Sequence, residues 1–268
     1  MTDKTDSPLA ASDLPEIVKK IRARTPARLL AGRAGAAYRT STQLKLREDH
    51  AAARDAVRTE LNLAEIVGAD FVKRWQLFEV RTRAATKEEY LLRPDLGRLF
   101  DDASRAEVAK RCTRGSDLQI AIGDGLSVTA VQAQVPSLLP LLYEGAQARG
   151  WQVGQSFVIR HCRVGVLNEF GELLDPKVAV LLIGERPGLA IAESLSAYMA
   201  YRPCTGHTDA ERNLISNIHA RGLSPQIAAT RILNFAAQMM QAQISGSTLR
   251  EELPEADPSS AKMRPRSG

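Results

Sequence analysis

Two glycine-rich turns hold the side chains best suited to bind a ligand, and the first is the run 184–188, GERPG. It follows a continuous apolar stretch, and its glycines allow a ligand to come close to the backbone. Glu185 could accept charge-assisted hydrogen bonds from amide N–H groups. The same spacing also fits an ordinary tight turn after a core strand, with Glu185 and Arg186 in solvent.

The second turn is the run 123–127, GDGLS, which also follows an apolar stretch. Asp124 or Ser127 could cap the helix that comes next, and the free N–H groups of a helix start suit a phosphate or a carbonyl. Simple capping is the more frequent explanation of such residues. The full glycine patterns of dinucleotide-binding and P-loop proteins are absent from the sequence.

The histidines and cysteines form no catalytic or metal-binding pattern. The four histidines give no H-x-x-x-H or H-E-x-x-H spacing, and no G-x-S-x-G elbow occurs. His161 and Cys162 are adjacent, so on a strand their side chains would point to opposite faces. Stand-alone hydrolase or metalloenzyme chemistry therefore has no support in this sequence.

The composition, with 44% hydrophobic and 25% charged residues, is that of an ordinary soluble globular protein. The longest apolar run, 178–184, is far shorter than the roughly 20 residues that cross a bilayer, so we expect no membrane segment. The polar N-terminus lacks the features of a secretory signal. Three widely spaced cysteines without a C-x-x-C pair favour a reducing cytoplasm over a disulfide framework.

Positive charge is concentrated in residues 17–47, which contain nine Lys and Arg and no Asp or Glu. Such a run could bind nucleic acid, an acidic partner or the phosphate of a cofactor, or could be a solvated surface. Tyr38 is the only aromatic residue inside it, whereas single-strand binders interleave aromatic and basic residues. A nucleic-acid-binding module is therefore one alternative, beside a stand-alone α/β nucleotide-binding protein.

Strand and helix patterns alternate along the chain and predict an α/β fold. We expect a Rossmann-like, mostly parallel sheet with flanking helices, preceded by a small helical N-terminal domain. In such a sheet ligands bind beyond the carboxyl ends of the strands, where the two turns would lie. Strands are predicted at 77–82, 118–123, 156–160, 178–183 and 195–201, and helices at 42–63, 127–134, 136–149, 209–219 and 224–243.

The expected organisation has four parts. Residues 1–11 form a disordered N-terminus and 12–73 a helical N-terminal domain, in which Asp13 could cap the first helix. Residues 74–246 form the α/β domain, and 247–268 form a flexible C-terminal tail rich in Pro, Ser and Arg.

Seven segments, in order along the chain, resemble the small (light) subunit of ethanolamine ammonia-lyase. They extend over nearly the whole sequence, from about Leu14 to Gly246. A single short match would be weak, whereas seven in order are a strong resemblance. The segments are 31–35 (AGRAG), 93–98 (RPDLGR), 124–127 (DGLS), 162–164 (CRV), 177–189 (KVAVLLIGERPGL), 193–196 (ESLS) and 215–219 (ISNIH).

The resemblance implies a subunit of an adenosylcobalamin-dependent lyase that converts ethanolamine to acetaldehyde and ammonia by a radical mechanism. In that family a large subunit carries a TIM barrel with the ethanolamine site. The small subunit packs against it, and cobalamin lies base-on in the interface. The resemblance also implies that residues 74–246 contact cobalamin, that six large and six small subunits form a hetero-oligomer, and that neither nucleic acid nor a membrane is a partner.

The family's cofactor contacts carry over to this sequence by motif. The resemblance implies that Val164 packs on the cofactor and that Glu185 accepts hydrogen bonds from corrin side-chain amides. Leu214 stands where a family member has a cysteine, and only a backbone contact would survive that change. The neighbouring residues Arg163, Gly184, Arg186 and Ser194 complete the expected cofactor-binding set, and no catalytic or metal-ligating residue is expected in this chain.

Two departures from known patterns shape the remaining expectations. The family can carry a long N-terminal extension that lowers solubility or targets the enzyme to a bacterial microcompartment. Here the resemblance to the family begins near Leu14, so that extension looks missing. We therefore expect the protein to be in the cytoplasm and not enclosed in a microcompartment. Base-off cobalamin proteins use Asp-x-His-x-x-Gly, but the run 217–222, NIHARG, has Asn first and lies late in the chain. His219 is therefore expected to be structural.

Overall fold

The computed structural model describes residues 16–24, 33–34, 36–187 and 192–252, and a six-stranded sheet of order β3-β5-β4-β6-β7-β8 forms its centre. The strands β3, β5, β4 and β6 are parallel, whereas β7 and β8 are each antiparallel to the preceding strand in the sheet. The predicted α/β class with a mostly parallel sheet is confirmed. The strands are β3 (Glu79–Arg81), β4 (Leu118–Gly123), β5 (Phe157–Arg160), β6 (Val178–Gly184), β7 (Leu195–Tyr201) and β8 (Asn213–Ile218).

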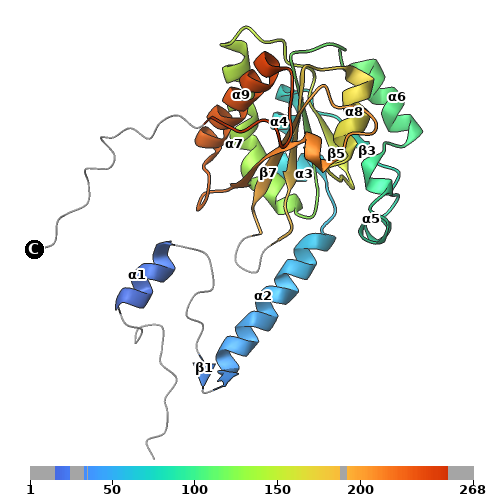
Figure 1. Cartoon of the computed structure of the whole chain (residues 1–268). Helices are drawn as coiled ribbons and strands as arrows, with labels where there is room; N and C mark the ends of the chain where they lie inside the picture. The colour runs from blue at the N-terminus through green and yellow to red at the C-terminus, as the bar shows by residue number, and fades with distance from the viewer. Residues whose placement is uncertain (1–15, 25–32, 35, 188–191, 253–268) are drawn as a thin grey trace, which may run out of the picture.

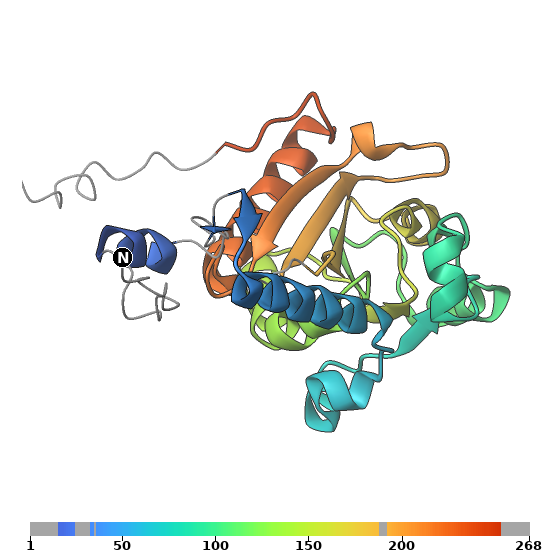
Figure 2. The same ribbon diagram turned by 90° about the horizontal axis from the view of Figure 1, so that it is seen from below.

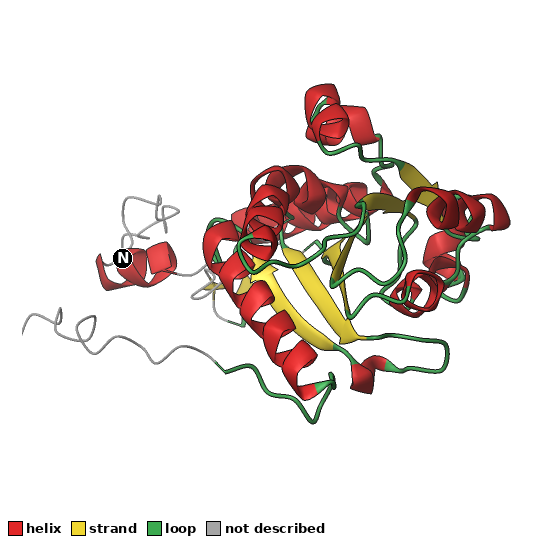
Figure 3. Ribbon diagram, turned by 90° about the horizontal axis from the view of Figure 1, so that it is seen from above, coloured by secondary structure: helices red, strands yellow, loops and turns green. Residues whose placement is uncertain are grey.

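Helices cover both faces of this sheet (Figures 1 and 3). One face packs against α7 (Val128–Gln147) and α9 (Pro225–Ala242), with α3 (Leu63–Val67) and α4 (Ala69–Arg74) at its margin. The other face packs against α6 (Asp102–Arg111) and α8 (Val166–Leu174). Every residue of β4 and β6 is buried, which explains their continuous apolar sequences.

The N-terminal part of the described chain projects from this body in Figure 1, and its long helix, which contacts α7, lies across the body in the view from below (Figure 2). This part consists of α1 (Glu16–Arg24), a hairpin of β1 (Arg33–Ala34) and β2 (Ala37–Tyr38), and α2 (Thr40–Arg58). The helix α2 has no buried residue. The helix predicted at 42–63 is divided, because α2 ends at Arg58 and α3 begins at Leu63. The predicted cap at Asp13 lies outside the described residues, and no described helix is long and apolar enough to cross a membrane.

The helix predicted at 209–219 is wrong. A 3-10 turn, η3 (Asp209–Glu211), is followed directly by β8. Thr208 and Glu211 form a capping box, which is a genuine helix-start signal, but it stabilises one turn only. Beyond that turn the backbone pairs with β7 while Ile215 and Ile218 enter the core, so tertiary pairing overrides the local signal.

The helical segments predicted at 127–134 and 136–149 form one helix, α7, with Pro136 and Pro140 inside it. A proline removes one backbone hydrogen bond and crowds the preceding turn. The helix continues because its apolar side packs on the sheet on both sides of Pro136, as the buried residues Val135 and Leu138 show. The C-terminal helix, by contrast, begins as predicted, with Ser224 as its cap and Pro225 in its first turn.

Candidate functional site

The two glycine-rich turns lie side by side. They follow β4 and β6, which are parallel neighbours with Gly123 opposite Ile183, and the N–H of Leu126 donates to the carbonyl of Gly184 at 3.1 Å. Ser127 caps α7 by accepting the N–H of Ala130 at 3.2 Å. The sheet therefore brings together the two turns that sequence analysis singled out, at the carboxyl ends of its strands.

Asp124 does not cap the helix. Its fully buried carboxylate instead accepts the N–H of His161 at 2.9 Å and the N–H of Cys162 at 2.8 Å. Both amides belong to the loop that follows β5, and this loop leads directly to Arg163 and Val164. The ends of β4 and β5 are thus joined by one side chain, which the local sequence pattern assigned to a different task.

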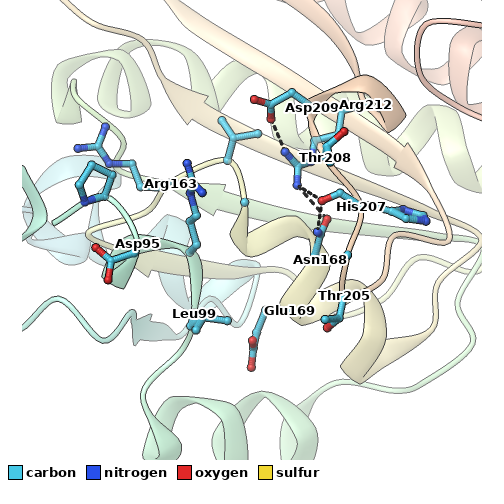
Figure 4. Close-up of a pocket in the computed structure, with 15 residues that line it drawn as sticks. Asp95, Leu99, Arg163, Asn168, Glu169, Thr205, His207, Thr208, Asp209 and Arg212 are labelled. Carbon is cyan, nitrogen blue, oxygen red and sulfur yellow. Dashed lines mark hydrogen bonds and ion pairs between the residues drawn. The ribbon is translucent and has the colours of Figure 1, made fainter.

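A cleft of about 590 Å³ opens beside this loop (Figure 4). The loop after β5 lines it with Arg163 and Val164, the helix α8 lines it with Asn168, and the segment before β8 lines it with residues of the run 205–212. Arg98, at the end of the short 3-10 helix η2 (Leu96–Arg98), completes the wall. Segments far apart in sequence therefore supply the cleft.

Arg212 lines the cleft as a buried cation, with its side chain 6% exposed. One guanidinium nitrogen is paired with Asp209, and the other donates to the side-chain oxygen of Asn168 at 2.9 Å. Nε has no partner. The guanidinium is therefore fixed in position while part of its donor capacity is unused.

Three buried polar atoms around the cleft lack hydrogen-bond partners: Nε of Arg163, Nε of Arg212 and Nδ1 of His207. Arg163 has no acidic partner among the described residues and stacks on the ring of Tyr90, 4.2 Å from its centre. Buried donors without partners carry a free-energy cost of about 1–3 kcal/mol each. A ligand rich in acceptor oxygens would satisfy them.

Glu185 lies at the end of β6 and is tied to the following segment. Its N–H donates to the carbonyl of Ser194 at 3.0 Å, and the hydroxyl of Ser196 donates to its carboxylate. Burial, followed by the nearby Glu185 carboxylate, raises the pKa of Tyr198 above its ordinary value. Glu185 is therefore fixed near the phenol of Tyr198, an arrangement between two strands that no local pattern could predict.

Leu214 lies on the same face of the sheet. In register it is opposite Tyr198, which is opposite Leu181, and residues opposite one another on paired strands share a face. Tyr198 and Val164 both pack against the core cluster under α8. Tyr198 therefore lies between Glu185 and Leu214 on the face that holds the cleft, and no hydrogen bond or ion pair among the described residues joins Val164, Glu185 and Leu214. Leu214 is 46% exposed, and Arg186 is also exposed.

The sequence patterns missed the bond between Asn168 and Arg212 and the hydrogen bonds of Asp124. Asn168 and Arg212 are 44 residues apart, so no local spacing could have indicated their contact. Arg98 and Arg163 lie inside two of the segments on which the family resemblance rests. The described residues contain no group of three or more His, Cys, Asp or Glu that could hold a metal ion.

The two buried thiols, those of Cys112 and Cys162, are expected to be inert. Burial raises the pKa of Cys112 to about 12, and burial also raises the pKa of Cys162 well above its ordinary value. Thiolate is the reactive form, so only the exposed Cys204 should react with a disulfide reagent near pH 8. We expect one fast thiol per native chain and three in denaturant. A second fast thiol in the native protein would contradict the burial of Cys112 and Cys162.

Comparison with known proteins gives a consistent result across the chain. Residues 15–250 match the family model of the ethanolamine ammonia-lyase light chain. The ethanolamine ammonia-lyase small subunit of Clostridium perfringens is 40% identical over 235 residues, 88% of this chain and 78% of that protein. The small subunit of Fusobacterium nucleatum is 39% identical over 253 residues, which are 90% of this chain and 84% of that protein. The small subunit of Clostridium acetobutylicum is 40% identical over 235 residues, which are 88% of this chain and 95% of that protein.

Proposed function

The chain belongs to the ethanolamine ammonia-lyase light chain family, and from this premise we propose that it is the small subunit of an enzyme that converts ethanolamine to acetaldehyde and ammonia. The description of its relatives as small subunits implies a large-subunit partner. We further propose that adenosylcobalamin binds between the two subunits and contacts the cleft face of this chain. The assembly of six large and six small subunits and the cytoplasmic location stay predictions.

The single observation that best supports cofactor binding is a set of buried nitrogens without partners at the cleft, Nε of Arg163, Nε of Arg212 and Nδ1 of His207, of which the two guanidinium nitrogens are donors. Cobalamin carries many amide carbonyl oxygens and a phosphodiester, which are the acceptors that such donors require. Adenosylcobalamin supplies radical chemistry when bound, and the protein supplies binding, orientation and protection from water. The residues present therefore fit the group that the family implies.

Individual roles follow from the chemistry of the side chains. Val164 offers an apolar surface to the cofactor, and Leu214 adds exposed apolar surface on the same face of the sheet. Glu185 accepts hydrogen bonds from corrin side-chain amides, while Ser194 and Gly184 fix the backbone on either side of it. Arg186 is exposed and free to reach either the cofactor or the large subunit.

His219 supports base-on binding because the structure gives it another task. It is buried, and its Nδ1 accepts the N–H of Arg221 at 3.2 Å within a tight turn. Burial lowers the pKa of His219 below its ordinary value. The ring is enclosed against Gly222, and a Cβ at that position would lie 2.7 Å from Nε2. The occupied Nδ1 and the packing of the ring against this turn support a structural role for His219.

Reconstitution tests the proposed function. We expect acetaldehyde release from ethanolamine only when the cognate large subunit, this chain and adenosylcobalamin are all present, measured by a coupled alcohol dehydrogenase assay. Omitting each component in turn provides the controls, and size-exclusion chromatography reports complex formation. Full activity without this chain would refute a required small subunit. A complex that forms and binds cobalamin but releases no acetaldehyde would refute ethanolamine as the substrate.

A further inference from the structure

Asp124 holds a loop that the proposed cofactor would touch. The carboxylate has no solvent exposure, and each of its oxygens accepts one of two successive amide N–H groups, those of His161 and Cys162. The paired strands β4 and β5 end at Gly123 and Ile159 in this register, so the two bonds lie beyond the regular ladder. The Asp124 carboxylate therefore satisfies two backbone N–H groups of the loop that have no partner strand.

The backbone that Asp124 holds is an unusual one. His161 has a φ of 58°, in the left-handed region that a side chain with a Cβ rarely adopts. The carbonyl of His161 accepts the hydroxyl of Thr82 at 2.9 Å, and that of Cys162 accepts the hydroxyl of Tyr90 at 3.0 Å. A strained turn persists only where its surroundings over-determine it. Here the Asp124 carboxylate holds the turn by accepting the N–H groups of His161 and Cys162.

The charge of Asp124 is balanced from the opposite side. Nζ of Lys87, in α5 (Lys87–Leu92), lies 3.5 Å from the carboxylate and 3.3 Å from the carbonyl of Gly125, and the Lys87 side chain is 8% exposed. Because the pair is enclosed, the carboxylate cannot itself reach a ligand in the cleft. Any influence of Asp124 on a bound cofactor must pass through the loop.

We propose that Asp124 is a positioning residue that fixes Arg163 and Val164 in the geometry that binds the cofactor, a role that rests on the proposed function. The N–H of Arg163 donates to the carbonyl of Gly97 at 2.8 Å, so the loop is also tied to the segment that carries Arg98. Loosening the loop after β5 thus displaces two walls of the cleft at once. The core cluster on the α7 face contains no residue of this loop, whereas Cys162 belongs to the cluster on the α8 face.

The test is Asp124→Asn in the complex of this chain with its large subunit. Asparagine keeps the shape but directs an NH₂ donor at one of the two amide N–H groups, which loses a charge-assisted hydrogen bond. We expect the Kd for adenosylcobalamin, titrated spectroscopically, to rise about tenfold or more. Amide hydrogen exchange at Cys162 and Arg163 should become faster. Val135→Ala in α7, buried on the opposite face, is the matched destabilised control and should leave the Kd unchanged.

The outcomes separate this proposal from the proposed function. A wild-type complex that does not bind adenosylcobalamin removes the proposed function, and the role of Asp124 with it. A wild-type complex that binds, with an Asp124→Asn Kd equal to its own, overturns the positioning role alone. If Asp124→Asn does not fold, Thr82→Val provides the second variant, because it removes only the hydroxyl that holds the His161 carbonyl. It should weaken cofactor binding by a smaller factor, and an unchanged Kd there overturns the proposal.

Discussion

A chain carrying Gly184→Ala is expected not to fold. The last residue of β6 lies against the turn after β4, and a Cβ there would clash with the carbonyl oxygen of Ser127 and lie 2.6 Å from that of Asp124. Both obstacles are backbone atoms in a buried region, so neither can rotate away. We expect a loss of more than about 4 kcal/mol in the free energy of unfolding, measured by urea denaturation or seen as insoluble expression.

Gly115→Ala is the matched control for this prediction. Gly115 has a φ of 76° and open space where a Cβ would lie, so alanine there introduces backbone strain without a clash. Strain of that kind costs about 1–2 kcal/mol. A stable Gly184→Ala chain that has lost only cofactor affinity would instead make Gly184 a direct contact. A chain that does not fold, as expected, would show that glycine is needed at position 184 because it lets the two turns approach each other.

The position of each turn at the end of a strand could be predicted from the sequence because it depends on local features, whereas the pairing of β4 with β6 that brings the turns together could not. Each turn follows a continuous apolar run of the kind that forms a strand buried on both faces, and neighbouring parallel strands end at the same edge. Ser127 and Ser224 precede helices and cap them as their residue type favours. Strand ends and helix caps of this kind can be predicted because the local preference of the residues agrees with the fold.

The remainder of the site depends on contacts between distant segments. The capping box at Thr208 and Glu211 resembles the start of a helix, but pairing with β7 makes the following residues the strand β8 and places Leu214 opposite Tyr198. Arg212 is fixed by Asn168 on α8, and Asp124 by amides 37 and 38 residues away. A local sequence pattern cannot predict such partners, because these hydrogen bonds depend on where each distant segment lies in the fold.

Arg163→Met is expected to raise the Kd for adenosylcobalamin about 10- to 100-fold in the complex with the large subunit. Methionine retains apolar packing against Tyr90, whereas the half-buried guanidinium is lost, which has no acidic partner among the described residues and donates to the carbonyl of Tyr90 at 3.0 Å. A hydrogen bond from a charged donor contributes about 1.5–3 kcal/mol, and each 1.4 kcal/mol is tenfold in affinity. Arg163→Lys should recover only part of the loss, because lysine keeps the charge but not the planar fork of donors.

Arg149→Met is the matched control for Arg163→Met. Arg149 also stacks on an aromatic ring, that of Trp151 at 5.7 Å, but it bonds to Asn234 of α9 on the opposite face of the sheet. Both substitutions remove one positive charge and one stacked guanidinium, so a general electrostatic effect would weaken cofactor binding equally in the two variants. Binding that is weakened only by Arg163→Met would locate the effect in the cleft. Equal Kd values for both variants and the wild type would exclude Arg163 as a cofactor contact.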